Sequence, residues 1–92
     1  MKQTAVRAEY TFSISLVSRD VATGRAVYTI STNIPDCTAA NVTWRLFSDH
    51  CSGFLSGGQY IVDESSMTNG ESYYLTAEYY YSGYSYGAEC NV

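Results

Sequence analysis

Apolar and polar residues alternate along most of this chain, and helical spacing of apolar positions is hard to find. The segment 10–16 shows the pattern clearly, because aromatic and aliphatic residues alternate there with Thr and Ser. In a β-strand successive side chains point to opposite faces, so a period of two indicates a strand with one buried face. The sequence therefore predicts an all-β fold.

Turn signals separate the predicted strands. Asn69-Gly70 is the strongest of them, since Asn-Gly between two β-prone segments is typical of a tight hairpin. The glycine-rich segment 49–58 is predicted to be a loop in which Phe54 and Leu55 fold back as a lid over one end. The explicit strand predictions cover residues 10–16, 26–32, 42–48, 60–62, 73–81 and 84–92. About seven short strands at this spacing are typical of a β-sandwich or a small barrel, and we favour the sandwich.

The predicted core is weighted toward aromatic residues. The chain has 92 residues and 10 tyrosines but few large aliphatic side chains, so one domain covering residues 1–92 is all that it can form. Tyrosine rings can be buried while their hydroxyl groups stay hydrated or hydrogen-bonded. Trp44, which alternates inward with Val42 and Leu46, is the best candidate for the centre of this core.

Charge is distributed unevenly along the chain. The net charge is −4, and all five basic residues precede Phe47, whereas the segment 48–92 has six carboxylates and no Lys or Arg. Nucleic-acid binding needs cations that neutralise phosphates, so the second half is not expected to bind nucleic acid. No run of about 18 apolar residues exists, which argues against membrane insertion. Segment 1–7 lacks the apolar run of a signal peptide, so either the chain is not exported or Met1 replaces a removed leader.

The segment from Met67 to Ala77 resembles the E–F corner of fibronectin type III and immunoglobulin-like domains. In that corner an apolar residue is followed three residues later by Gly and six residues later by Tyr, and here these positions are Met67, Gly70 and Tyr73. The resemblance extends over about residues 42–86. It implies an immunoglobulin-like antiparallel β-sandwich, with a jelly-roll-like or barrel topology as the alternative.

Three cysteines allow one disulfide with one free thiol, a metal site, or three buried thiols. In an immunoglobulin-like sandwich the third and last predicted strands run in the same direction, which places Cys51 and Cys90 at one pole and Cys37 at the other. The resemblance thus implies a disulfide between Cys51 and Cys90. If this bond forms, an extracellular or virion location is favoured, and if it does not, a host cytoplasm is favoured.

Sites for catalysis and metal binding are weakly supported. Asp49, His50 and Cys51 are the residue types of a nucleophilic triad, but consecutive residues rarely converge in the way that a triad requires. A zinc site from Cys37, His50, Cys51 and Cys90 would need two adjacent ligands. The side chains that could supply oxygen ligands to calcium are Asp63, Glu64, Asn69 and Glu71, but they miss the known loop spacing. We therefore expect no enzyme activity and no cofactor.

The segment 79–87 is rich in Tyr, Ser and Gly, the residues that dominate binding loops. Alternation places Tyr74 and Tyr80 on the outer face of the predicted hairpin, while Tyr81 and Tyr84 flank its turn. The alternative is that these tyrosines only stabilise the hairpin through cross-strand pairs worth roughly 0.2–1 kcal/mol each. The predicted binding residues are Tyr74, Tyr80, Tyr81, Tyr84 and Tyr86.

These observations favour a non-enzymatic protein–protein interaction module that binds through the tyrosine-rich hairpin and an acidic face. Such a module would suit a virion, a pilus or a cell surface. The alternative is a small intracellular inhibitor, for example one encoded by a phage, that blocks a basic surface of a host enzyme or defence complex. The expected partner in both cases is a protein, and neither nucleic acid nor a small molecule.

Overall fold

The computed structural model describes residues 10–91, so segment 1–7 and Val92, on which the leader and last-strand predictions partly depend, lie outside it. The described residues form seven strands, all paired antiparallel, and no helix. They are β1 (Phe12–Asp20), β2 (Arg25–Thr32), β3 (Thr43–Phe47), β4 (Ser52–Ser56), β5 (Gln59–Asp63), β6 (Tyr74–Tyr81) and β7 (Tyr84–Asn91). The all-β prediction is confirmed, and each of the six predicted strand ranges overlaps an observed strand.

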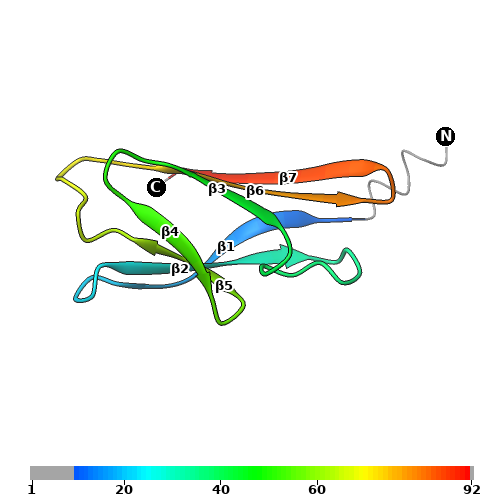
Figure 1. Ribbon diagram of the computed structural model, residues 1–92, viewed down its shortest axis with the longest axis horizontal. Coiled ribbons are helices and arrows are strands. Elements are labelled where there is room, and N and C mark those ends of the chain that lie inside the picture. The colour runs from blue at the N-terminus through cyan, green and yellow to red at the C-terminus, as the bar shows by residue number, and fades with distance from the viewer. Residues whose placement is uncertain (1–9, 92) are drawn as a thin grey trace.

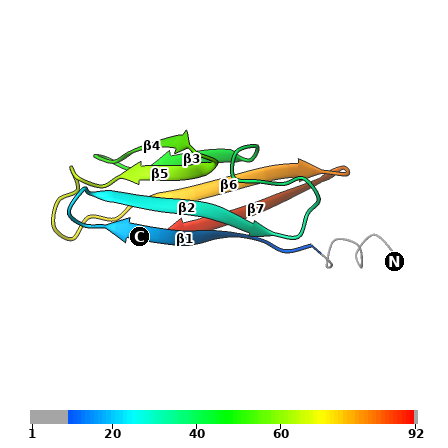
Figure 2. The same ribbon diagram turned by 90° about the horizontal axis from the view of Figure 1, so that it is seen from below.

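Two sheets pack face to face. One has the strand order β1-β2-β5-β4 and the other the order β3-β6-β7. In Figure 1 the three-stranded sheet lies above β1, β2 and β5. Figure 2, turned by 90°, shows the strands of the two sheets crossing at an angle, with β1 beside β7.

The hairpin of β6 and β7 extends beyond the third strand of its sheet. Its two strands pair from Tyr74 opposite Asn91 to Tyr81 opposite Tyr84. In the turn, Ser82 and Gly83 have φ angles of 52° and 83°, as a two-residue hairpin turn requires. β3 pairs with β6 only as far as Glu78, so residues 79–81 continue as part of a two-stranded ribbon.

The segment predicted to be a glycine-rich loop contains a strand instead. β4 pairs with β5 across Gly57-Gly58, whose φ angles are 59° and 78°. Two successive positive φ angles are easy only for residues such as glycine, and they produce a tight hairpin. The lid prediction is also wrong: Phe54 pairs with Ile61 within the sheet, and its side chain is 41% exposed.

A β-bulge interrupts β1. Leu16 lies opposite Tyr28 and Ser18 lies opposite Val27, so Val17 is an extra residue on this strand. An extra residue reverses the alternation of all later side chains. Arg19 consequently lies opposite the fully buried Ala26, on the face of the sheet that is directed toward the core.

The core lies between the two sheets. Its buried cluster is made of Ala26, Tyr28, Tyr60, Val62, Tyr73 and Leu75, so half of its members are tyrosines, as the composition predicts. Tyr28, Leu75 and Val62 are the largest fully buried side chains. Trp44 is not at the centre, because it lies on the edge strand β3 and packs against the cluster while only partly buried.

Candidate functional site

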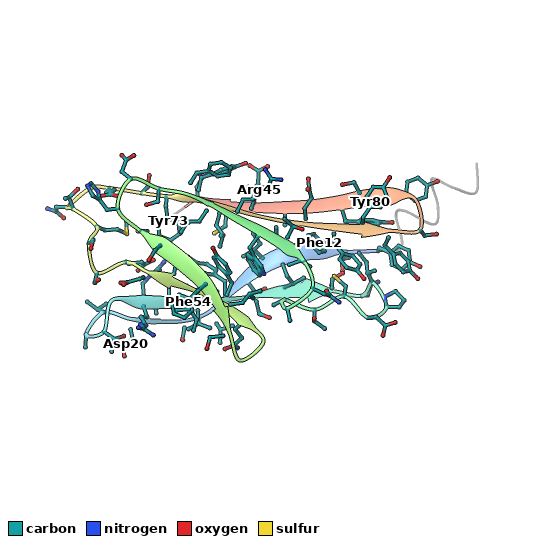
Figure 3. All side chains as sticks on the ribbon, in the orientation of Figure 1. Phe12, Asp20, Arg45, Phe54, Tyr73 and Tyr80 are labelled. Carbon is teal, nitrogen blue, oxygen red and sulfur yellow. The ribbon has the colours of Figure 1, made fainter. Side chains whose placement is uncertain are left out.

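The outer face of the three-stranded sheet is set by the alternation along β6. Leu75 and Ala77 are buried, with exposures of 0% and 1%, and this orients Thr76, Glu78 and Tyr80 away from the core. Tyr80 is 73% exposed, and among the large hydrophobic side chains of residues 10–91 only Val21 is more exposed. Figure 3 labels Tyr80 on β6, near the hairpin turn.

The neighbouring strands add charged and small residues to this face. Thr43 of β3 and Gly87 of β7 lie on either side of Glu78. One row further along, Arg45 and Glu89 lie on either side of Thr76. Arg45 is also labelled in Figure 3, on the same sheet as Tyr80.

These residues line a hollow of about 470 Å³ that opens to solvent. Its lining is Thr43, Arg45, Thr76, Ala77, Glu78, Gly87, Ala88 and Glu89. A smaller hollow of about 100 Å³ shares Thr43 and Glu78 with it and continues to Tyr80 and Ser85. We call the two hollows together the outer trough.

Gly87 contributes no side chain to the trough and leaves space there. A Cβ atom at this position would meet only the backbone oxygen of Ala77, at 3.8 Å, so the space above it is open. A larger residue here would divide the trough, whereas Thr43 and Thr76 beside it are too short to do so.

Two charged groups in the trough have no partner among residues 10–91. Among residues 10–91, neither Arg45 nor Glu78 makes a side-chain hydrogen bond or an ion pair. Glu89 accepts a hydrogen bond of 2.7 Å from the hydroxyl of Tyr74, and this bond is the main cause of a raised pKa for Tyr74. Arg45 and Glu78 are therefore both available to an external group.

The predicted binding tyrosines separate onto two faces. Tyr74 and Tyr80 lie on the outer face, as expected, but the Tyr74 ring also contacts Phe47, with centroids 5.8 Å apart. Of these two, only Tyr80 lines the outer trough.

The other predicted tyrosines, Tyr81, Tyr84 and Tyr86, are half-buried on the opposite face of the hairpin. Tyr10 packs edge-on against Tyr81 and Tyr86, with centroids 5.6 and 6.0 Å apart. Tyr79 stacks on Tyr81 at 6.5 Å. These contacts within the chain stabilise the end of the hairpin. For Tyr81, Tyr84 and Tyr86 they support the alternative interpretation of the sequence, in which the tyrosines stabilise the hairpin and do not bind a partner.

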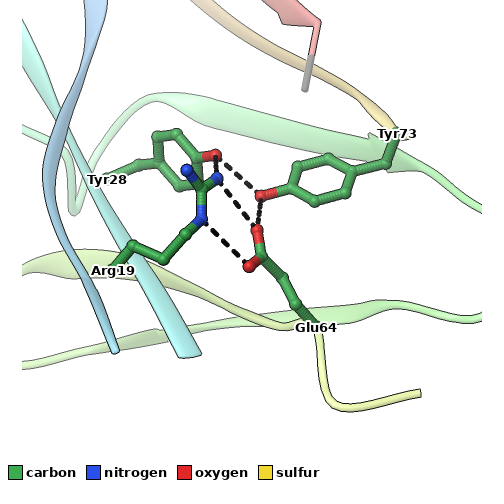
Figure 4. Close-up of polar contacts among 4 residues, drawn as sticks. All are labelled: Arg19, Tyr28, Glu64 and Tyr73. Atoms are coloured by element: carbon green, nitrogen blue, oxygen red, sulfur yellow. Dashed lines mark hydrogen bonds and ion pairs between the residues drawn. The ribbon is translucent and has the colours of Figure 1, made fainter. Parts of the chain in front are cut away.

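A polar cluster closes the sandwich at the end away from the hairpin turn. Arg19 donates two hydrogen bonds to the Glu64 carboxylate, at 3.1 and 3.0 Å, and Tyr73 donates another. The hydroxyl groups of Tyr28 and Tyr73 are 2.7 Å apart (Figure 4). Burial alone would raise the pKa of Glu64, but the bonds from Arg19 and Tyr73 hold it below its usual value. The corner motif thus supplies a buried Tyr73, with Gly70 at a φ of 84° before it.

The acidic residues of the second half do not share one face. Glu64 lies in the polar cluster, and Asp63 accepts hydrogen bonds from Ser65. Glu71 accepts bonds from Thr68 and from His50, and its pKa is lowered mainly by the Thr68 backbone N–H and then by His50. On the outer trough only Glu78 and Glu89 remain.

The cysteines are all free thiols, so the structure differs from the predicted Cys51–Cys90 bond. Cys51 precedes β4 of one sheet and Cys90 lies on β7 of the other, and both pack against the same core cluster from opposite sheets. Burial raises the pKa of Cys37, which is not part of that cluster. Within residues 10–91 no three His, Cys, Asp or Glu side chains are grouped so that they could hold a metal ion together.

Sequence patterns alone do not identify Thr43, Arg45 and Gly87 as site residues. The pairing of β3, β6 and β7 brings these residues together, and β3 and β6 are far apart in the sequence. The one local signal is Gly87, since glycine in the middle of a strand often marks a place where another group approaches closely.

In the part of the chain that the structure describes, no helix is long and apolar enough to cross a bilayer. No protein family, curated protein or solved structure matches the chain.

Proposed function

We propose that this chain is an immunoglobulin-like, non-enzymatic module that binds another protein through the outer trough, with Tyr80 as the central contact. A virion, a pilus or a cell surface is the proposed setting. The observation that carries the proposal is a 73% exposed tyrosine beside a hollow whose Glu78 has no partner among residues 10–91.

The strand order supports the immunoglobulin-like assignment. Constant-type immunoglobulin domains have one sheet of the first, second, fifth and fourth strands and another of the third, sixth and seventh. The orders β1-β2-β5-β4 and β3-β6-β7 correspond to this arrangement. The buried Tyr73 after the corner glycine is a second point in its favour.

The chemistry of the trough supports a protein partner. Tyrosine and arginine are enriched where interfaces concentrate their binding energy, and Tyr80 and Arg45 both belong to this face. A large exposed aromatic ring beside a hollow can bury its area against a partner at a small cost in side-chain entropy. The open shape of the trough fits an extended segment lying across the strands.

A second candidate is an inhibitor that covers a basic surface of an enzyme or a defence complex. The observation that favours it is the presence of Glu78 and Glu89 in the same trough as Tyr80. Both candidates use this surface. They differ in the consequence of binding, because only the inhibitor would block the activity of its partner.

Site-specific crosslinking tests the proposal in the cells or particles that contain the protein. The photoreactive residue p-benzoylphenylalanine replaces Tyr80 in one variant and Val21 in the control. Val21 is 88% exposed in the turn after β1, far from the trough along the chain. We expect one defined protein to crosslink from position 80 and not from position 21.

The affinity of the captured protein then provides the decisive measurement. Y80S should weaken binding by roughly tenfold or more, as loss of a central aromatic contact does, while V21S should not. Both variants should melt within a few degrees of the parent, since both side chains are exposed. Equal capture from the two positions, or an unchanged affinity of Y80S, would refute the proposal.

A further inference from the structure

We propose that the outer trough binds an arginine side chain of the partner protein, with the guanidinium between the carboxylate of Glu78 and the ring of Tyr80. This inference rests on the proposed function and specifies the chemistry of its partner. It follows from the unpaired charge, the exposed ring and the empty volume that meet at this point.

The charge comes from two carboxylates. Glu78 and Glu89 lie on adjacent strands, diagonally across the sheet, where side chains are separated by about 7–8 Å. Arg45 lines the same hollow but forms no ion pair with either of them. The trough therefore carries an excess of one negative charge, and Glu78 has all its hydrogen-bonding capacity free among the described residues.

The ring lies at the right separation from this carboxylate. Glu78 and Tyr80 are two residues apart on one face of β6, so their Cα atoms are about 7 Å apart. A guanidinium between them can donate two hydrogen bonds to the carboxylate and stack on the ring face. An ammonium group is a compact, strongly hydrated charge that cannot do both, so the site favours Arg over Lys.

The volume allows the side chain to enter. Gly87 lies directly opposite Glu78 and leaves its space empty, and Ser85 opposite Tyr80 is small. The aliphatic stem of an arginine could lie over Gly87 while its head reaches Glu78, as long cationic side chains commonly do. In this proposal the absence of a side chain at Gly87 provides the space through which the arginine enters the site.

The test uses N-acetyl-arginine methylamide as the probe and the full chain labelled with ¹⁵N. The lysine analogue and the neutral citrulline analogue, which keeps the shape of arginine, are the comparison probes. Addition of the arginine probe should shift the amide resonances of Thr43, Ser85 and Gly87. Citrulline should bind roughly tenfold more weakly, because hydrogen bonds to charged groups are the stronger ones, and lysine should lie between the two.

Three variants separate the site from the general acidity of the chain. E78Q and D49N remove the same charge, but Asp49 lies in the loop after β3 and does not line the trough. G87V fills the hollow, and the open space above Gly87 lets the strand keep its fold. E78Q and G87V should abolish the localised shifts, and D49N should leave them unchanged.

The failure of this inference is distinguishable from the failure of the proposed function. Equal binding of citrulline and arginine, or equal effects of E78Q and D49N, would overturn the arginine site even if Tyr80 still crosslinks to a partner. Shifts spread over the other carboxylates would overturn it too. If Y80S leaves partner affinity unchanged, the proposed function falls, and the assignment of the arginine to a protein partner falls with it.

Discussion

The indole ring of Trp44 lies parallel to the ring of Tyr60, with centroids 4.7 Å apart and planes 9° apart. The two residues come from different sheets, since Trp44 lies on the edge strand β3 and Tyr60 on the inner strand β5, so this stack joins the two sheets. The indole N–H also donates a hydrogen bond of 2.7 Å to the backbone oxygen of Ala39. Trp44 thus connects the loop before β3, its own strand and the opposite sheet.

Replacement of Trp44 by Ala should lower the free energy of unfolding by about 3 kcal/mol, the lower end for losing such a ring, because the side chain is only partly buried. W44F should recover part of this loss, since it restores a ring against Tyr60 but not the bond to Ala39. Urea unfolding followed by far-UV circular dichroism measures both values. Equal stability of W44A and the parent would show that the stack does not hold the sheets together.

Gly53 should be intolerant of any side chain. A Cβ atom there would lie 2.2 Å from the hydroxyl oxygen of Tyr60, so G53A must displace the ring that stacks on Trp44. We expect a loss of about 1–3 kcal/mol, typical of overpacking. G87A is the matched control, because its Cβ meets open space, and it should be neutral or slightly stabilising. The prediction fails if G53A and G87A have the same melting temperature.

The polar cluster should make stability depend on acid pH. The folded-state pKa of Glu64 is lowered, so its contribution is present above the unfolded value of about 4.3 and is lost as pH falls through the folded value. R19Q removes the two hydrogen bonds from the guanidinium and its positive charge, and leaves only the bond from Tyr73 to oppose the effect of burial on the Glu64 pKa. The variant should be less stable at pH 7 and should lose less of its remaining stability between pH 5 and pH 2.

Unfolding by urea at a series of pH values gives this comparison directly. R45Q is the control, since it removes an equal charge from a residue with no ion pair among the described residues. If R45Q and R19Q have the same pH profile, the effect comes from net charge rather than from the Arg19–Glu64 contact.

Oxidation tests the predicted pairing of the cysteines. Cys51 and Cys90 contact one core cluster and Cys37 does not belong to it, so mild oxidation should link Cys51 to Cys90. Closing that loop would stabilise the domain by roughly 3–4 kcal/mol in the chain-entropy picture. Peptide mapping without reductant identifies the bond, with C37S as a control that should still form it. A Cys37–Cys51 linkage would contradict the prediction.

Strands were predictable where apolar and polar residues alternate along the sequence. β6 is the best case, because Leu75 and Ala77 alternate with polar residues and the observed strand matches the predicted one closely. β4 was missed because Phe54 and Leu55 are adjacent apolar residues, both substantially exposed on an edge strand, so no alternation marks them. Gly57-Gly58 was a usable turn signal there.

The site was predictable only in part, for a different reason. Alternation alone places Tyr80 outward, and this was correct. The trough depends on Thr43, Glu78 and Gly87 lying in one row, which long-range pairing decides. The inward position of Arg19 could not be predicted from alternation either, since one extra residue in β1 reverses the face on which this side chain lies.

The extra residue Val17 also has a consequence for self-association through the edge of the sheet. β1 is an edge strand, with unpaired backbone groups along one side and with Leu16 and Val17 about half exposed. A straight edge of this kind is a template for aggregation, because another chain can add to it as a further strand. The bulge at Val17 breaks the regular spacing of those donors and acceptors and increases the local twist. The irregularity that turns Arg19 toward Glu64 therefore also makes this edge a poorer template for the addition of a further strand.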